Sequence, residues 1–134
     1  MADPYLYTVT NNVATFSINN APWNLMSLEY IDRLEEQLPD VLADDHVRAM
    51  IFTGEGLDNF SAGMNLKQIP AGIERAGSAE AFFGQRHKVL DMIERGGTPA
   101  IATLYGYCLG GGLELPLACH CRIAAATGAQ IGLP

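Results

Sequence analysis

The sequence lacks the features that would place the protein on nucleic acid or in a membrane. Basic residues are scarce: 8 Lys and Arg stand against 15 Asp and Glu, for a net charge of −7. A nucleic-acid-binding surface needs the opposite balance. No run of about 18 apolar residues is present, so no membrane-spanning helix is expected. The opening residues, MADPYLYTVTNN, lack the basic region and apolar core of a signal peptide. We therefore expect a cytoplasmic protein with neither nucleic acid nor membrane among its partners.

Cysteine is also rare. Cys108, Cys119 and Cys121 are an odd number in apolar surroundings, which argues against a disulfide framework and favours a reducing compartment. His120 lies between the last two, but this spacing suits a structural zinc site poorly and no second pair follows. We expect no metal. The cysteines are instead predicted to be buried small residues near a helix end, and His120 a core histidine with a satisfied hydrogen bond.

What remains is a chain of 134 residues that is 49% hydrophobic, enough for one domain with a real core. β-Branched and aromatic residues over 5–10 and 13–18, joined by Asn11-Asn12, predict a hairpin. Apolar periodicity predicts a helix after Ser27, which Pro39 ends or kinks. The glycine-rich stretch 54–77 is expected to be mostly loop, with a helical turn over 66–69. The other expected elements are a helix from Ser78 to Gly96, a helix over 111–119, strands over 47–53, 100–106 and 122–126, and a candidate strand over 129–132. Strands and helices alternate, which is typical of an α/β architecture.

Two glycine-containing loops follow predicted strands. One covers Asn59 to Lys67 and the other Gly110 to Glu114. Glycine allows a backbone to approach a ligand closely, and the first N–H groups of a helix have no partner inside the helix. Such loops can present donors to an anion or a developing oxyanion. The alternative is that these glycines only end strands and permit tight helix packing. The phosphate-loop and dinucleotide-binding spacings are both absent.

Glu114 is the one acidic residue in an otherwise apolar helical segment. Burying a carboxylate there without a partner would cost several kcal/mol or force its protonation. We therefore expect Glu114 to have a functional rather than a structural role.

The segments GYCLGGGLELPLAC and FSAGMNLKQI together resemble the crotonase superfamily, the enoyl-CoA hydratase/isomerase family. VATFSINN, VRAMIFTG, TPAIATLYG and IGLP match it in the same order, so the resemblance spans the whole chain. It implies the N-terminal part of a crotonase-like ββα spiral, an acyl-CoA thioester as substrate, and a homotrimer or a hexamer. It implies no cofactor, because coenzyme A is part of the substrate.

The resemblance also assigns roles to particular positions. It implies that the backbone N–H groups of Met64 and Gly111 bind the thioester oxygen, within loops that include Gly63 and Gly110. Ala62 matches a position whose carbonyl meets the adenine of CoA. Lys67 matches a lysine near the CoA phosphates, although a solvated surface lysine is an equal alternative. Asn65, where relatives often have aspartate, is expected to keep a capping role. Glu114 matches the first of two catalytic glutamates in hydratases.

The chain departs from this family pattern at its end. In hydratases a second glutamate directly follows the proline of the segment that corresponds to IGLP, and this chain ends at Pro134. We expect residues 1–134 to be the N-terminal portion of one domain whose C-terminal part is absent. The expected activity of the parent protein is the syn addition of water to a 2-enoyl-CoA. The alternatives are another reaction of the family, such as isomerisation or hydrolysis, or a noncatalytic acyl-CoA-binding fragment.

The acyl pocket is predicted less sharply. Its far wall is expected to involve residues 68–85, with Phe82 and Phe83 as candidates, together with parts of the absent C-terminal portion. Trp23 either lines this pocket or only packs against its neighbours.

Overall fold

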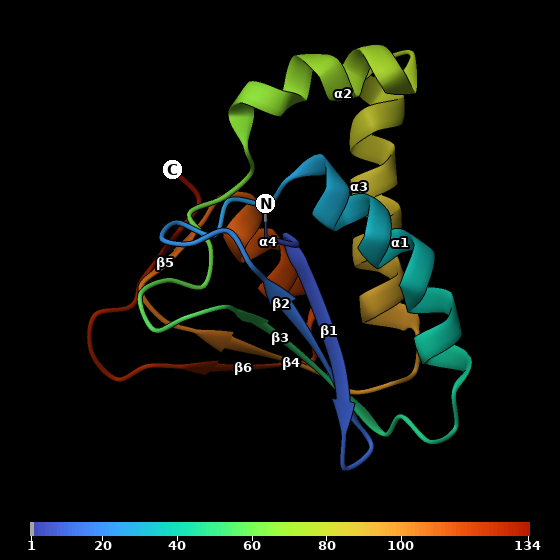
Figure 1. Ribbon diagram of the computed structural model, residues 1–134, viewed down its shortest axis with the longest axis vertical. Coiled ribbons are helices and arrows are strands. Elements are labelled where there is room, and N and C mark those ends of the chain that lie inside the picture. The colour runs from blue at the N-terminus through green and yellow to red at the C-terminus, as the bar shows by residue number, and fades with distance from the viewer. Residues whose placement is uncertain (1) are drawn as a thin grey trace.

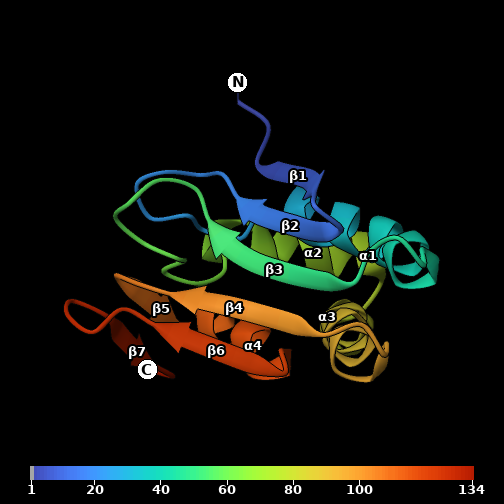
Figure 2. The same cartoon turned by 90° about the horizontal axis from the view of Figure 1, so that it is seen from below.

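A computed structural model describes residues 2–134, which form an α/β fold with two sheets (Figures 1 and 2). The five-stranded sheet has the order β1-β2-β3-β4-β6, and β5 pairs with β7 in a two-stranded sheet. The pair β1–β2 is antiparallel, and all the other pairs are parallel. The strands are β1 (Tyr5–Thr10), β2 (Val13–Ile18), β3 (Ala49–Gly54), β4 (Ala100–Leu104), β5 (Tyr107–Leu109), β6 (Cys121–Ala124) and β7 (Gln130–Gly132).

The helices gather on one face of the five-stranded sheet (Figure 2). They are α1 (Leu28–Ala43), the 3-10 turn η1 (Leu66–Gln68), α2 (Ile69–Ala76), α3 (Ala79–Arg95) and α4 (Gly111–Ala118). Between them and the sheet lies the core, in which the rings of Phe16 on β2 and Phe52 on β3 stack with their centroids 4.8 Å apart. Parallel neighbours in the sheet are joined by these crossover helices, as the alternation in the sequence predicts.

The hairpin and the helix starts agree with the sequence predictions. Asn11 and Asn12 have φ values of 51° and 65°, which suit the tight turn between β1 and β2. The Ser27 side chain accepts a hydrogen bond from Tyr30 N at 3.1 Å, and that of Ser78 accepts one from Ala81 N at 3.1 Å. Both serines therefore cap their helices, α1 and α3.

Pro39 does not end α1, which continues to Ala43. Proline removes one donor from a helix. Here Pro39 is exposed, so the carbonyl left without that donor faces the solvent side. Leu38 and Val41 on the opposite side are buried in the core, and their packing keeps the last turns helical.

The expectation of a loop over 54–77 is wrong for its last part, because α2 occupies Ile69–Ala76. Pro70 lies in the first turn of α2, where a proline is tolerated. Gly77 ends the helix in a left-handed conformation, and its N–H donates to the Ile73 carbonyl at 2.9 Å. The strand expected over 100–106 is also shorter than predicted. β4 stops at Leu104, and the chain turns into β5, which the sequence analysis did not separate.

The cysteine and histidine expectations hold only in part. Cys108 and Cys119 are buried free thiols, but Cys121 lies on the edge strand β6 and is exposed. His120 is exposed rather than in the core. Its ring nevertheless has two partners: Nδ1 accepts from Ala100 N at 3.0 Å, and Nε2 lies 2.9 Å from the Glu94 carbonyl oxygen. His120 therefore ties the end of α4 to the start of β4 and the end of α3.

Candidate active site

The first glycine-containing loop is held on both sides by backbone hydrogen bonds. On one side, Ser61 N donates to the Tyr107 carbonyl at 2.9 Å, and Leu109 N donates to the Ser61 carbonyl at 3.1 Å. On the other, Met26 N donates to the Gly63 carbonyl at 2.8 Å. The Ser61 hydroxyl also accepts from Gly63 N at 3.1 Å. The loop thus lies as an extra strand between β5 and the segment before α1, with little freedom to shift.

Two asparagine side chains, which the sequence analysis did not single out, hold the surrounding loops together through hydrogen bonds to their backbones. The Asn24 side chain, fully buried, donates to the carbonyls of Glu55 at 3.0 Å and Asn59 at 2.8 Å. The Asn59 side chain accepts from Tyr107 N at 2.9 Å and donates to the Pro22 carbonyl at 2.7 Å. Buried amides are stable only when such groups are paired. Their sequence signal is weak, because asparagine in a loop is usually a solvated turn residue.

The second loop turns at Gly110 and starts α4. Gly110 has φ 54° and ψ −123°, a conformation that side chains disfavour. Its carbonyl accepts the N–H groups of Leu113 at 2.8 Å and Glu114 at 3.0 Å, and its own N–H donates to the Gly132 carbonyl at 3.0 Å. The Gly110 amide is therefore already used inside the fold, while its conformation directs the next amide, that of Gly111, out of the loop.

Met64 and Gly111, which the resemblance pairs, do come together. A methyl group added at Gly111 would lie 2.9 Å from Met64 Cγ and 3.6 Å from Met64 N. Among residues 2–134, neither the Met64 N–H nor the Gly111 N–H donates a hydrogen bond. At Gly111 this follows from its place in the first turn of a helix, where N–H groups have no partner inside the helix. Two free donors thus lie side by side where the two loops meet.

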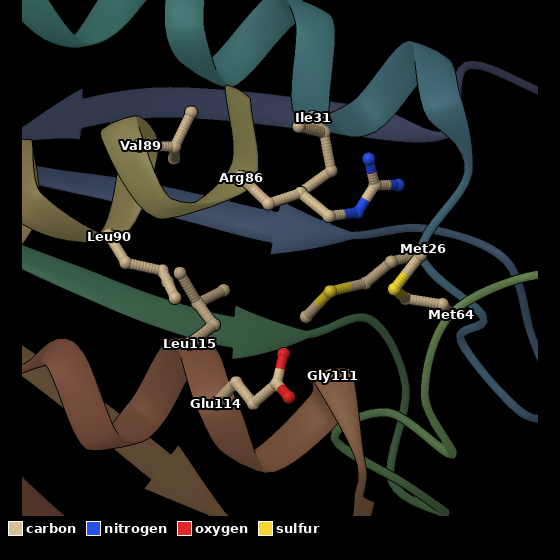
Figure 3. Close-up of a pocket in the computed structure, with 9 residues that line it drawn as sticks. All are labelled: Met26, Ile31, Met64, Arg86, Val89, Leu90, Gly111, Glu114 and Leu115. Carbon is tan, nitrogen blue, oxygen red and sulfur yellow. The ribbon is translucent and has the colours of Figure 1, made fainter. Parts of the chain in front are cut away.

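Glu114 lies in the first turn of α4 and points into the same hollow as Met64 and Gly111 (Figure 3). Glu114 is exposed within this chain, so its carboxylate does not bear the cost of unpaired burial. α4 buries Leu113, Leu115 and Pro116 and turns Glu114 outward. Within the described residues its carboxylate makes no hydrogen bond or ion pair. It is therefore free to bind water or a ligand group.

The hollow is a small cavity of about 30 Å³, large enough to hold water. Apart from Arg86 and Glu114, its lining is almost entirely apolar. It is lined by Met26, Ile31, Met64, Arg86, Val89, Leu90, Gly111, Glu114 and Leu115. Figure 3 shows α1 and α3 forming one side of it and α4 the other.

The aromatic residues considered for the acyl pocket do not line this cavity. Phe82 is buried beside the cavity wall without lining it, Phe83 is 41% exposed, and Trp23 packs on Tyr107 with ring centroids 5.8 Å apart. On this side the cavity is lined by Ile31 on α1 and by Arg86, Val89 and Leu90 on α3. The helical spacing of 86, 89 and 90 marks one face of α3. Only the packing of α3 against α1 and α4 shows that this face borders a cavity.

The remaining predicted ligand residues lie outside the cavity. Ala62 is half-buried, and its N–H donates to the Trp23 carbonyl at 2.8 Å. Lys67 is exposed in η1 and makes no ion pair within residues 2–134. The Asn65 side chain caps η1 by accepting from Lys67 N at 3.2 Å, as expected. These positions stand at the surface, next to the loop that carries Met64.

Two further properties concern the described part of the chain as a whole. Residues 2–134 contain no group of three or more His, Cys, Asp or Glu side chains placed to hold a metal ion. None of the helices there combines the length and the apolar character needed to cross a bilayer.

Comparison with known proteins agrees with this geometry. The family model described as enoyl-CoA hydratase/isomerase matches residues 13–132. The fatty acid oxidation complex subunit alpha of Shewanella sp. (strain W3-18-1) is 32% identical over 123 residues, which are 91% of this chain and 17% of that protein. The chain therefore spans about a sixth of the curated relatives that it matches.

Solved structures show the same relationship in space. An enoyl-CoA hydratase/carnithine racemase from Magnetospirillum magneticum has a TM-score of 0.88 at 27% identity, covering 100% of this chain and 50% of that one. An enoyl-CoA hydratase from Thermoplasma volcanium has a TM-score of 0.83 at 30% identity, covering 98% of this chain and 51% of that one. The fold thus corresponds to the N-terminal half of these structures. The chain belongs to the enoyl-CoA hydratase/isomerase family, the crotonase superfamily.

Proposed function

We propose that this chain binds acyl-CoA thioesters and provides the first half of an enoyl-CoA hydratase site. The observation that supports this is the pair of free N–H groups at Met64 and Gly111 beside the Glu114 carboxylate, all on one small cavity. Two free backbone donors on one cavity suit the oxygen of a thioester, on which negative charge develops during the reaction. In this proposal Gly63 and Gly110 hold the donor loops, and Ala62 and Lys67 lie along the path of the CoA moiety.

The chemistry that follows is the addition of water to a 2-enoyl-CoA. Glu114 holds the water and takes one of its protons while the water oxygen bonds to C3. The π electrons of the C2=C3 bond move onto the thioester oxygen, where the Met64 and Gly111 N–H groups stabilise the enolate. C2 then takes a proton from an acid on the same face, which gives syn addition. The family resemblance places that second acid directly after Pro134.

We propose further that residues 1–134 are the N-terminal portion of one acyl-CoA-binding domain that assembles as a trimer or hexamer. The structural matches support the first part, because they cover 100% and 98% of this chain and about half of the other. The 134-residue chain alone is a candidate noncatalytic acyl-CoA-binding unit.

The test is a Glu114→Gln substitution, measured in the 134-residue chain and in the full polypeptide that carries this sequence. Loss of the conjugated enoyl absorbance reports hydration, and calorimetry reports thioester binding. We expect Glu114→Gln to lower kcat by about 10²–10⁴-fold and to leave thioester binding nearly unchanged. Glu36→Gln, an exposed glutamate on α1, is the matched control and should change neither. Unchanged turnover in Glu114→Gln would remove Glu114 from the mechanism, and absence of thioester binding would refute the proposal as a whole.

A further inference from the structure

Arg86 on α3 is a buried cation that makes no hydrogen bond or ion pair within residues 2–134. The residue is only 8% exposed, and its guanidinium lies over the Phe82 ring, 4.1 Å from the centroid. Its Nε and Nη1 atoms are buried, and no group in residues 2–134 accepts a hydrogen bond from either. A buried donor that is left unpaired destabilises the folded chain, and a charged one does so more strongly. Stacking on Phe82 recovers only part of that cost.

The acids nearest to Arg86 on α1 are already paired with other groups. Asp32 lies 3.0 Å from Arg75 Nη2 and accepts from Gln85 Nε2 at 2.9 Å. Glu35 lies 3.1 Å from Lys88 Nζ and accepts from Gln85 Nε2 at 2.6 Å. The carboxylates between α1 and α3 are therefore satisfied without Arg86.

Burial lowers the pKa of the Arg86 guanidinium, and the charges of Asp32 and Glu114 act in the opposite direction without contacting it. An arginine remains protonated in proteins despite such shifts. The site therefore holds a permanent positive charge with two unused donors.

This charge lies in the wall of the cavity that we assign to the acyl group. Figure 3 shows Arg86 reaching from α3 toward Ile31 and Met26, across the cavity from Glu114. The other α1 and α3 side chains that line the cavity are apolar, namely Ile31, Val89 and Leu90. A wall for a saturated acyl chain would be better completed by an apolar residue than by an unpaired guanidinium. The thioether side chain of Met26 lines the same cavity and can shift to admit a ligand.

We propose that Arg86 forms a subsite for a carboxylate at the far end of a short acyl chain, so that the preferred substrate is the CoA monothioester of a dicarboxylic acid. This inference rests on the proposed function, because it takes the thioester to lie at Met64 and Gly111. The guanidinium presents its donors in a fixed fork that matches a carboxylate. Arg86 lines the same cavity as Met64 and Gly111, so a short chain spans the distance from the thioester to the guanidinium.

The test compares two thioesters with the same five-carbon chain, glutaryl-CoA with a terminal carboxylate and pentanoyl-CoA without one. Calorimetry measures their Kd for the wild-type chain and for Arg86→Met, Arg86→Lys and Arg95→Met. Arg95 is an exposed arginine on the same helix and serves as the matched control. The wild type and Arg95→Met should bind glutaryl-CoA at least about tenfold more tightly than pentanoyl-CoA. Arg86→Met should lose this preference and bind pentanoyl-CoA as before. Arg86→Lys, which keeps the charge without the fork, should retain part of the preference.

The outcomes separate the two proposals. If pentanoyl-CoA binds and glutaryl-CoA binds no better, or if Arg86→Met keeps the preference, the carboxylate subsite is refuted while the acyl-CoA site stands. If neither thioester binds the wild type, the proposed function fails and the subsite fails with it. Thermal unfolding monitors the fold. Arg86→Met should be at least as stable as the wild type, because it replaces a buried unpaired charge with an apolar chain of similar length.

Discussion

The contact between Gly111 and Met64 can be tested by adding one methyl group. In Gly111→Ala the new carbon would lie 2.9 Å from Met64 Cγ, whereas carbon atoms in contact normally lie about 3.5–4.0 Å apart. The two groups must therefore separate by roughly 0.6 Å or more. Methionine is flexible, so its side chain can absorb much of this movement. We expect a loss of about 1 kcal/mol in the free energy of unfolding, at the low end of the range for overpacking.

Urea denaturation of the wild type, Gly111→Ala, Met64→Ala and the double variant measures this contact as a cycle. Met64→Ala removes Cγ, so the Gly111→Ala methyl group should cost about 1 kcal/mol less in that background. Binding of pentanoyl-CoA should follow the same pattern, because the added methyl group also lies 3.6 Å from Met64 N. Gly111→Ala alone should weaken binding, and the double variant should recover part of it.

If the losses in unfolding free energy of Gly111→Ala and Met64→Ala simply add in the double variant, within about 0.3–0.5 kcal/mol, the contact is refuted. The proposed pairing of the two amides is then refuted with it. Gly84→Ala, inside α3, is the control. A methyl group there meets nothing within 4 Å, so this variant should be stabilised by about 0.5–1 kcal/mol. Gly112→Ala should be the most destabilising of these three glycine substitutions. Its methyl carbon would lie 2.3 Å from the Ser61 carbonyl oxygen, a backbone atom, so its cost should exceed that of Gly111→Ala by about 2 kcal/mol or more.

Three further predictions concern the cysteine thiols and the hydrogen bonds of the Asn59 side chain. In the native protein a thiol reagent should modify Cys121 rapidly and Cys108 and Cys119 slowly, because Cys121 alone among the three is exposed; equal rates for all three would contradict the burial described above. Burial raises the pKa of the Cys119 thiol to about 12 from a usual value of 9.0, so above pH 9 the unfolded chain loses a proton that the folded chain keeps. Stability measured by urea denaturation should therefore fall as pH rises, with Cys119 contributing up to about 1.4 kcal/mol per pH unit, and Cys119→Ala should flatten this slope. Asn59→Ala should lower the free energy of unfolding by about 2–4 kcal/mol, since it leaves two backbone groups without partners; a loss below 1 kcal/mol would show that water replaces them.

Local patterns predicted most of the elements because they depend on neighbours in the chain. Asn11-Asn12 between two β-branched segments specifies a turn, and Ser27 and Ser78 before apolar stripes specify helix starts. The errors occurred where distant packing outweighed the local signal. α1 passes through Pro39 because its far side is buried in the core, and α2 forms in a stretch that glycine and proline made resemble a loop.

The candidate site likewise combines features that the local sequence indicates with features that only tertiary packing decides. The sequence by itself indicated that the two glycine-containing loops can present free donors, because the first N–H groups of a helix have no partner inside it, and it supplied Glu114 as the one acid near them; the family resemblance named the amides of Met64 and Gly111. Only the tertiary structure decided that Met64 lies beside Gly111 and that Glu114 is exposed. It alone also showed that Arg86 on α3 faces the same cavity without a partner. These facts depend on how helices and loops from separate parts of the chain pack together. No local pattern records that arrangement, because burial and pairing are properties of the neighbours that folding brings into contact.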